Sequence, residues 1–432
     1  MGLWDVEEDI DDEIFPEDAL EDEDVPEEGN RYLSDSNAAL ELVARVLPNS
    51  TGNYSKRKGI QKIDDMLDID FLSALKRIQL TNEAQLQMKL ALLSDKLAEQ
   101  EKYKVLKNKA VIGLGGKFSA GKSKFINSIL KAGEELLPED QNPTTSIPTY
   151  IVYGDREEIS AYTSNSERVT LDVEALQALT HKFYEKYGMG FSAFVNSLII
   201  SEPDMPYHDL VFLDTPGYSK ADAVGTGKKQ KELSDENKAY VQLRNVDYLI
   251  WLMDIENGVI SAPDIAFISK LGIETPILIV ANKADKMIDE DIEKIVELVR
   301  ITAQNAGLNV FGVTAYSSRC HKEWGNANMI SSFFNMAERK RTGKDDILAQ
   351  IEVIKKRVQK EIIQKIDNKV EERNSLNDII FRSNDIMEIR SLVALYGESM
   401  EEIRDMKAAQ RKYQANARKL ERALEKQYGR RQ

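Results

Sequence analysis

Four short segments of this chain carry residues that can bind a nucleoside triphosphate. In chain order they are GKFSAGKS at Gly116–Ser123, NPTTSIPT at Asn142–Thr149, DTPG at Asp214–Gly217 and NKAD at Asn282–Asp285. In the first, backbone N–H groups cradle phosphates, Lys122 reaches the β- and γ-phosphates and the Ser123 hydroxyl ligates Mg²⁺. In the third, Asp214 can hold Mg²⁺ through water, and the Gly217 N–H can bind the γ-phosphate. The segments therefore predict a Mg²⁺-dependent phosphate site.

The fourth segment indicates which base is bound. A strand-like run, Pro276–Ala281, delivers Asn282, Lys283 and Asp285 to one rim. A carboxylate there can accept hydrogen bonds from N1–H and the exocyclic amine of guanine, a pair of donors that adenine lacks. After a further predicted strand, Val310–Thr314, backbone contacts to the base are expected from Ala315, Tyr316, Ser317 and Ser318.

These residues need a scaffold of strands and helices. Apolar runs predict strands at Ala110–Leu114 and Leu210–Leu213, each directly before a phosphate segment, and helical spacing predicts a helix over Lys124–Leu130. That helix would point its N-terminus at the anion. The intermediate stretch adds a predicted strand, helix and strand at Glu158–Thr163, Thr170–Tyr187 and Phe194–Ser201. The pattern is typical of an α/β P-loop domain with a mostly parallel sheet and helices on both faces.

Residues 108 to about 320 resemble the GTPase domain of the dynamin superfamily. The form FSAGKS followed by FINSIL is especially similar to bacterial dynamin-like proteins. The resemblance implies that Gly116, Ser119, Ala120, Gly121, Lys122, Ser123 and Lys124 bind the nucleotide, with Lys122 at its phosphates. It also implies that Ser123, Thr145 and Asp214 hold Mg²⁺, and that Lys122, Thr145 and Gly217 act in hydrolysis. Thr144 is the alternative to Thr145, which is preferred because Pro148 follows three positions later.

The chain departs from the family pattern at two positions. Phe118 stands where eukaryotic dynamins place a glutamine that orients the attacking water, so the side chain at 118 cannot act in that way. Ile288 stands where relatives carry an acidic residue beyond the base-reading Asp285, and Asp289 comes one position late. Ser119 is retained, so the resemblance includes a monovalent cation near the phosphates.

The EH-domain-containing ATPases carry similar segments and bind adenine. They place a methionine directly after the aspartate, whereas Lys286 precedes Met287 here. We therefore expect GTP rather than ATP, on the basis of analogy.

Composition agrees with a multidomain protein that contains no disulfide. A length of 432 residues suggests two or three domains, and the single Cys320 cannot form an internal disulfide. No apolar run has the length needed to span a bilayer. We expect a cytoplasmic protein, peripheral to a membrane at most, with no nucleic-acid partner.

The net charge of −15 comes from the N-terminus. Residues 1–30 hold 15 of the 73 acidic residues and no Lys or Arg, which leaves 58 acidic residues against 58 basic ones. A disordered solvating tail is the simplest interpretation, and a docking segment for a basic surface is the alternative.

Helical stripes flank the GTPase-like region on both sides. Helices are predicted at Ser36–Leu47, Lys62–Gln79 and Asn82–Lys107, followed after residue 344 by two long apolar stripes with candidate breaks at Asn374–Asp378 and Gly397. An antiparallel bundle follows from this pattern. The expected division is a tail (1–30), N-terminal bundle helices (31–107), the GTPase domain (108–343) and C-terminal bundle helices forming a neck or short stalk (344–432).

Two segments are candidates for membrane contact. Lys407–Arg431 is basic and suits anionic lipid, although a solvated bundle face explains it better. Trp324–Lys344 carries Phe333 and Phe334 in an amphipathic stripe, for which packing on the sheet is the better explanation.

The sequence as a whole predicts a dynamin-like GTP hydrolase. Its switch segments would couple GTPase-domain pairing to bundle movement in membrane remodelling. It would act as a homodimer or larger assembly, and the short stalk makes a related companion chain a reasonable expectation. The alternatives are a slow nucleotide-dependent switch or scaffold that recruits proteins, and an ATP-binding membrane scaffold.

Overall fold

A computed structural model describes most of the 432-residue chain. The described residues are 29–47, 62–63, 65–73, 75, 78–130, 137, 147–164, 167–179, 183, 186–188, 191, 194–215, 217, 236–325, 328–339 and 344–428. Thr144, Thr145, the expected second switch at 222–227 and nearly all of the acidic tail lie outside them.

A ten-stranded mixed sheet forms the centre of the molecule. Its strand order is β10-β9-β8-β7-β1-β6-β2-β5-β3-β4. Parallel pairing joins β6, β1, β7, β8 and β9 into a continuous block. The strand bounds are Ala110–Gly116 (β1), Thr149–Tyr153 (β2), Glu158–Thr163 (β3), Arg168–Leu171 (β4), Val195–Glu202 (β5), Leu210–Asp214 (β6), Tyr248–Asp254 (β7), Ile277–Asn282 (β8), Val310–Ser317 (β9) and Lys322–Trp324 (β10). Because the strands of the parallel block run the same way, the segments after β1, β6, β7 and β8 lie at one edge.

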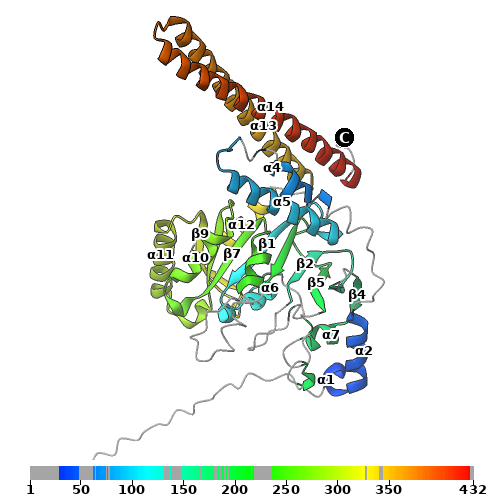
Figure 1. The fold of residues 1–432 in the computed structure, drawn as a ribbon. Coiled ribbons are helices and arrows are strands. Elements are labelled where there is room, and N and C mark those ends of the chain that lie inside the picture. The colour runs from blue at the N-terminus through cyan, green and yellow to red at the C-terminus, as the bar shows by residue number, and fades with distance from the viewer. Residues whose placement is uncertain are drawn as a thin grey trace, which may run out of the picture.

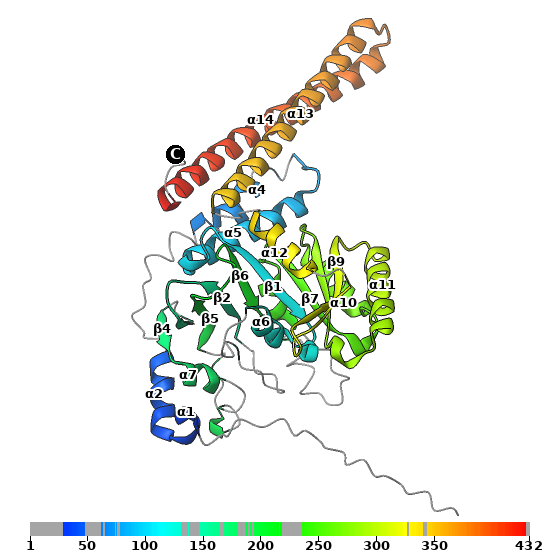
Figure 2. The same ribbon diagram turned by 180° about the vertical axis from the view of Figure 1, so that it is seen from behind.

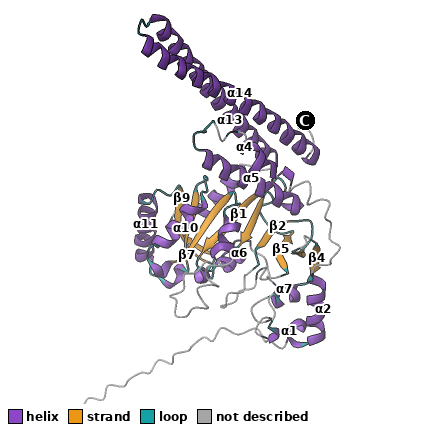
Figure 3. Cartoon of the chain, viewed as in Figure 1, coloured by secondary structure: helices purple, strands orange, loops and turns teal. Residues whose placement is uncertain are grey.

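Helices cover both faces of the sheet, as Figure 3 shows. Strand β7 explains why: Tyr248, Ile250 and Leu252 belong to one apolar cluster, and Leu249 and Trp251 belong to the other. The first face packs against α6 (Lys122–Leu130), α7 (Val173–Ala178) and α12 (Met329–Arg339), and the second against α10 (Ala262–Leu271) and α11 (Asp289–Asn305). This architecture confirms the predicted fold class.

Helix α12 lies in one of the two candidate membrane segments, and its packing shows which interpretation of that segment is correct. Phe333 and Phe334 are 0% and 1% exposed and pack in edge-to-face geometry against Tyr248 and Phe212 of the sheet. Side chains buried in this way cannot enter a lipid surface. The packing interpretation of Trp324–Lys344 is therefore confirmed, and the membrane interpretation is wrong.

A helical bundle stands on one end of the GTPase-like region. Figures 1 and 2 show the long hairpin of α13 (Lys344–Arg382) and α14 (Ile386–Tyr428) projecting from it, with α4 (Phe71–Ser73) and α5 (Glu83–Lys102) at its base. The apolar stripe of α13, including Ile351, Val358 and Ile362, is buried against Leu90 of α5 and Tyr413 of α14. N-terminal and C-terminal helices thus share one core, as predicted.

Helix α2 (Ser36–Val46) is the exception to that prediction. With α1 (Arg31–Ser34) it packs beside α7, where the Tyr32 hydroxyl donates to Asp172 at 2.8 Å. Its buried Leu42 and Val46 join the core of the sheet's first face. Placing residues 31–47 in the bundle was wrong, because the apolar stripe shows that a helix needs a partner but not which partner.

Three predicted boundaries also need correction. The C-terminal helices break at Ser383–Asp385, where Asp385 accepts from Met387 N at 2.8 Å, and Gly397 lies inside α14. The predicted helix over 170–187 starts too early, because Arg168–Leu171 forms β4 and Asp172 caps α7. Helix α5 ends at Lys102, and the segment Lys104–Leu106 is a short 3₁₀ turn.

Candidate nucleotide site

The predicted phosphate loop connects β1 to α6 at the carboxyl edge of the parallel block. Gly121 has φ +79°, in the left-handed region that favours glycine, and a Cβ there would lie 2.6 Å from Asn282 Nδ2. Gly116 ends β1, and Ser119 and Lys124 are exposed at either side of the turn. The loop therefore brings its backbone and the α6 N-terminus to one place, as an anion site requires.

Lys122 is buried at the start of α6. Its Nζ donates to the carbonyl oxygens of Gly116 at 3.3 Å and Lys117 at 3.2 Å. Burial lowers the pKa of Lys122 to about 8, and the nearby Asp214 carboxylate partly offsets this effect. A cation held by two long bonds to loop carbonyls is available to a phosphate oxygen, which is a stronger partner.

Ser123 and Asp214 form the centre of the site. Ser123 Oγ donates to Asp214 Oδ2 at 2.7 Å, so residues 91 positions apart meet as predicted. Asp214 is fully buried, and its Oδ1 has no hydrogen-bond partner among the described residues. Burial raises the pKa of the Asp214 carboxyl, while Lys122 and Ser123 oppose the shift.

This donor set fits Mg²⁺. A hydroxyl and a carboxylate are the hard oxygen ligands that this ion takes, together with waters and phosphate oxygens. The unpaired Asp214 Oδ1 supplies a free acceptor for a metal-bound water. In the part of the chain that the structure describes, no cluster of three His, Cys, Asp or Glu side chains offers a second metal site.

Gly217 lies against the phosphate loop. A Cβ at this position would be 2.4 Å from Phe118 Cα and 3.1 Å from Lys122 Nζ. Only glycine allows the DTPG segment to approach the loop so closely. The structure brings Gly217 to the lysine, whereas the catalytic role of Thr145 stays a prediction because that residue is outside the described part.

The predicted base-binding residues converge at the neighbouring corner. Asn282 Nδ2 donates to Ala120 O at 3.0 Å, and its Oδ1 accepts from Ser318 Oγ at 2.9 Å. The exposed Asp285 carboxylate accepts from Ser317 Oγ. Asn282 thus ties the phosphate loop to the base corner, and Asp285 lies at its rim.

Ala315 and Tyr316 lie on β9, just before that corner. Ala315 is fully buried, and the Tyr316 ring stacks edge-to-face on Phe125 at 5.3 Å. Their side chains belong to the core, so the polar groups that reach the corner belong to Ser317 and Ser318.

Asp254 is a site residue that the sequence analysis missed. Lys283 has φ +62°, and its Nζ donates to Asp254 Oδ2 at 2.7 Å. Asp254 ends β7 and pairs in register with Asn282. The sequence did carry a signal for Asp254: it is an acidic residue at the end of an apolar strand, next to the strand that carries NKAD.

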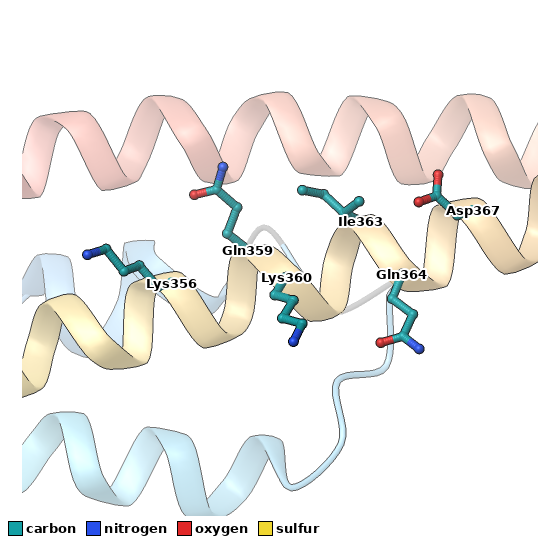
Figure 4. A pocket seen from close by; sticks show the side chains of 6 residues that line it. All are labelled: Lys356, Gln359, Lys360, Ile363, Gln364 and Asp367. Carbon is teal, nitrogen blue, oxygen red and sulfur yellow. The ribbon is translucent and has the colours of Figure 1, made fainter.

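Two other features lie away from this site. A shallow hollow on the exposed side of α13 is shown in Figure 4, where its lining comes from one helix: Lys356, Gln359, Lys360, Ile363, Gln364 and Asp367. Within the described residues, no helix is both long and apolar enough to cross a membrane.

Comparisons with known proteins agree with the motifs. Residues 112–297 match the family model described as the dynamin family. An uncharacterized protein in the xynA 3′ region of Caldicellulosiruptor sp. (strain Rt8B.4) is 27% identical over 241 residues, which cover 54% of this chain and 56% of that protein.

Two solved structures are similar in outline. One is an oligomerised bacterial dynamin pair described as sensing and tethering membranes (16% identity, TM-score 0.42, 80% of this chain and 49% of that chain). The other is Era in complex with MgGDPNP and part of 16S ribosomal RNA (14% identity, TM-score 0.31, 53% of this chain and 56% of that chain). The chain spans about half the length of these proteins and of the Caldicellulosiruptor relative.

Proposed function

We propose that this chain, whose residues 112–297 match the dynamin family model, binds and hydrolyses GTP with Mg²⁺. The observation that carries the proposal is the Ser123–Asp214 pair beside buried Lys122, with one Asp214 oxygen unpaired. In a pair of side chains with a purely structural role, both oxygens of a buried carboxylate would have hydrogen-bond partners. The unpaired oxygen of Asp214 therefore indicates that it binds a ligand.

The loop residues bind and orient the phosphates. Lys122 Nζ exchanges its carbonyl partners for β- and γ-phosphate oxygens, and the backbone N–H groups around Gly121 enclose the phosphates. Ser123 and Asp214 hold the Mg²⁺ site, where the ion, when bound, neutralises charge on the phosphate oxygens. Hydrolysis on this account is positioning plus electrostatic stabilisation, and no side chain acts as a general base.

Water positioning is assigned to the backbone of Gly217 together with Thr145. Phe118 has no group that can orient a water molecule, so the loop side chain used by eukaryotic dynamins is absent here. Slow basal turnover follows from this assignment, with acceleration on assembly. A monovalent cation at Ser119 is part of the same proposal.

The base corner selects guanine. The Asp285 carboxylate accepts from N1–H and the exocyclic amine of guanine, and adenine offers no such pair of donors. The Ser317 hydroxyl that now donates to Asp285 fixes the carboxylate's orientation.

The bundle provides the mechanical output. The turn of the α13–α14 hairpin carries Phe381, Ile386 and Met387, which are 81%, 80% and 70% exposed. This apolar tip supports peripheral membrane contact better than the basic face at 407–426, whose buried side is Tyr413, Ala417 and Leu420. The proposed activity is membrane remodelling or tethering by a homodimer or larger assembly of GTPase domains, alone or with a related companion chain.

Equilibrium binding of fluorescent GTP and ATP analogues tests the site. We expect Mg²⁺-dependent binding of the GTP analogue, its loss in Lys122→Ala, and at least tenfold weaker binding of the ATP analogue. Tighter binding of ATP would overturn the base assignment in favour of an ATP-dependent scaffold. Binding of GTP without turnover at any protein concentration would favour a switch that recruits proteins.

A further inference from the structure

Helix α5 contacts the bundle and the GTPase domain with different faces. Leu86, Leu90 and Leu97 are buried in the bundle core with the α13 stripe. Three polar residues of α5, Asp95, Lys96 and Glu99, instead contact the segments around the sheet. Figures 1 and 2 show α5 between the hairpin and the sheet from both sides.

The first of these contacts reaches the strand beside Asp214. The Tyr150 hydroxyl of β2 donates to Glu99 Oε1, and the tyrosine is buried at this contact. Strand β2 pairs with β6 so that Tyr150 lies opposite Leu213 and Thr149 lies opposite Asp214. Glu99 therefore contacts the strand that pairs directly with β6, and β6 ends at the Asp214 carboxylate assigned to Mg²⁺.

The second contact reaches the strand that feeds the phosphate loop. Asp95 pairs with Arg244, and Lys96 Nζ lies 2.9 Å from Asp247 Oδ1. Asp247 Oδ2 accepts from Val111 N of β1 at 2.9 Å. The same turn packs Val246 against β1, where a Cβ at Gly113 would be 2.7 Å from Val246 Cγ1.

Several buried polar atoms on α5 and on the segment that carries Arg244 have no hydrogen-bond partner. Among the described residues they include Gln100 Oε1 on α5 and, on the other segment, Gln242 Oε1, Arg244 Nε and Asn245 Oδ1. Unpaired buried polar groups are rare in folded proteins, and each one needs an explanation, of which a second arrangement that pairs the group is one. An interface of this kind can change its pairing more readily than a close-packed apolar one.

From these contacts we propose that Glu99 and Asp95 are positioning residues that couple the nucleotide site to the bundle. They act through Tyr150 and Arg244 on the strands that hold Asp214 and the phosphate loop. The inference rests on the proposed GTP site. Coupling is reciprocal, so nucleotide must alter the α5 contacts by the same free energy with which those contacts alter nucleotide affinity.

The test compares variants that break the links with variants that keep them. Tyr150→Phe and Asp95→Ala each remove one link, whereas Glu99→Gln keeps an amide oxygen to accept from Tyr150. Glu101→Ala is the charge-matched control on the same helix, and Lys89→Gln breaks the exposed α5 contact with Glu274, 3.1 Å long, which involves neither Tyr150 nor Arg244. Each variant is measured for Mg²⁺-dependent binding of a fluorescent GTP analogue, for KM and kcat, and for amide hydrogen exchange across α5.

The two link-breaking variants are expected to weaken nucleotide affinity by on the order of 5-fold or more, within the usual range of allosteric coupling. KM rises accordingly, and the control variants and Glu99→Gln stay within about 2-fold. In the wild type, the GTP analogue changes exchange in the last two turns of α5, and in Tyr150→Phe this change is lost.

Three outcomes separate the claims. Wild-type binding with unchanged affinity in both Tyr150→Phe and Asp95→Ala overturns the coupling and leaves the GTP site intact. Exchange in α5 that does not respond to nucleotide in the wild type also overturns it. Absence of Mg²⁺-dependent binding in the wild type overturns the proposed function itself.

Discussion

Replacing Asp214 by asparagine should move stability and nucleotide binding in opposite directions. The carboxylate is fully buried, Oδ2 accepts from Ser123 and Oδ1 has no partner among the described residues. Burial disfavours the charged form of this carboxylate, and asparagine has the same shape without the charge. Attraction to Lys122 offsets part of the cost of burying the charge, so we expect Asp214→Asn to stabilise the nucleotide-free protein by about 1 kcal/mol, the low end of the cost of a buried polar group with incomplete interactions.

Thermal unfolding with EDTA, and then with Mg²⁺ and a non-hydrolysable GTP analogue, measures both effects. One kcal/mol corresponds to roughly 2–4 °C in the melting temperature of a domain of 150–250 residues. Nucleotide at one hundred times its Kd adds about 2.7 kcal/mol to the wild type. The variant should therefore melt above the wild type in EDTA and below it with Mg²⁺ and nucleotide.

Asp264→Asn is the matched control. Asp264 is also a buried carboxylate, but it accepts from Ser261 Oγ at 2.6 Å in the capping box of α10. Asparagine keeps an amide oxygen for these hydrogen bonds but removes the charge that lies 3.7 Å from Lys117 Nζ, so this variant should be no more stable than the wild type in both conditions. Two results would contradict this account of Asp214. Asp214→Asn could melt below the wild type in EDTA, or its melting temperature could rise with Mg²⁺ and nucleotide as much as that of the wild type. Either result would show that the Asp214 carboxylate is not a metal ligand that burial destabilises in the nucleotide-free protein.

Two further predictions test the packing around the site. Burial raises the pKa of Glu99, so the native state loses stability as pH rises through that folded pKa. Glu99→Gln should therefore match the melting temperature of the wild type at acidic pH and exceed it increasingly as pH rises. A constant difference in melting temperature between pH 4 and pH 9 would contradict this assignment. Phe333→Ala should lower the free energy of unfolding by about 3–5 kcal/mol in urea titrations, because the ring is fully buried under the sheet; a loss below about 1 kcal/mol would show that α12 is not packed as described.

The sequence was most informative where one local pattern determines one local structure. The predicted strands of the parallel block were confirmed, because buried parallel strands are apolar runs and phosphate segments follow them directly. The loop, Ser123, Asp214 and Asn282 meet as predicted because their spacing is set by that strand order.

The sequence was least informative where a helix had to choose its partner. The apolar stripe of α2 is buried in the core of the sheet's first face and not in the bundle, and nothing in residues 36–46 distinguishes the two. Asp254 was missed for a similar reason, since its pairing with Lys283 depends on two strands lying side by side. The exposed tip at Phe381 and Ile386 could not be identified because a stripe does not show where the hairpin turns.

The most direct test of the account is phosphate release from GTP and from ATP across a range of protein concentrations, with and without anionic liposomes, using Lys122→Ala as the blank. The account predicts Mg²⁺-dependent GTP turnover that rises per molecule with protein concentration or lipid, with ATP turnover at the level of the blank. GTP turnover no higher than that of Lys122→Ala, or turnover confined to ATP, would contradict it.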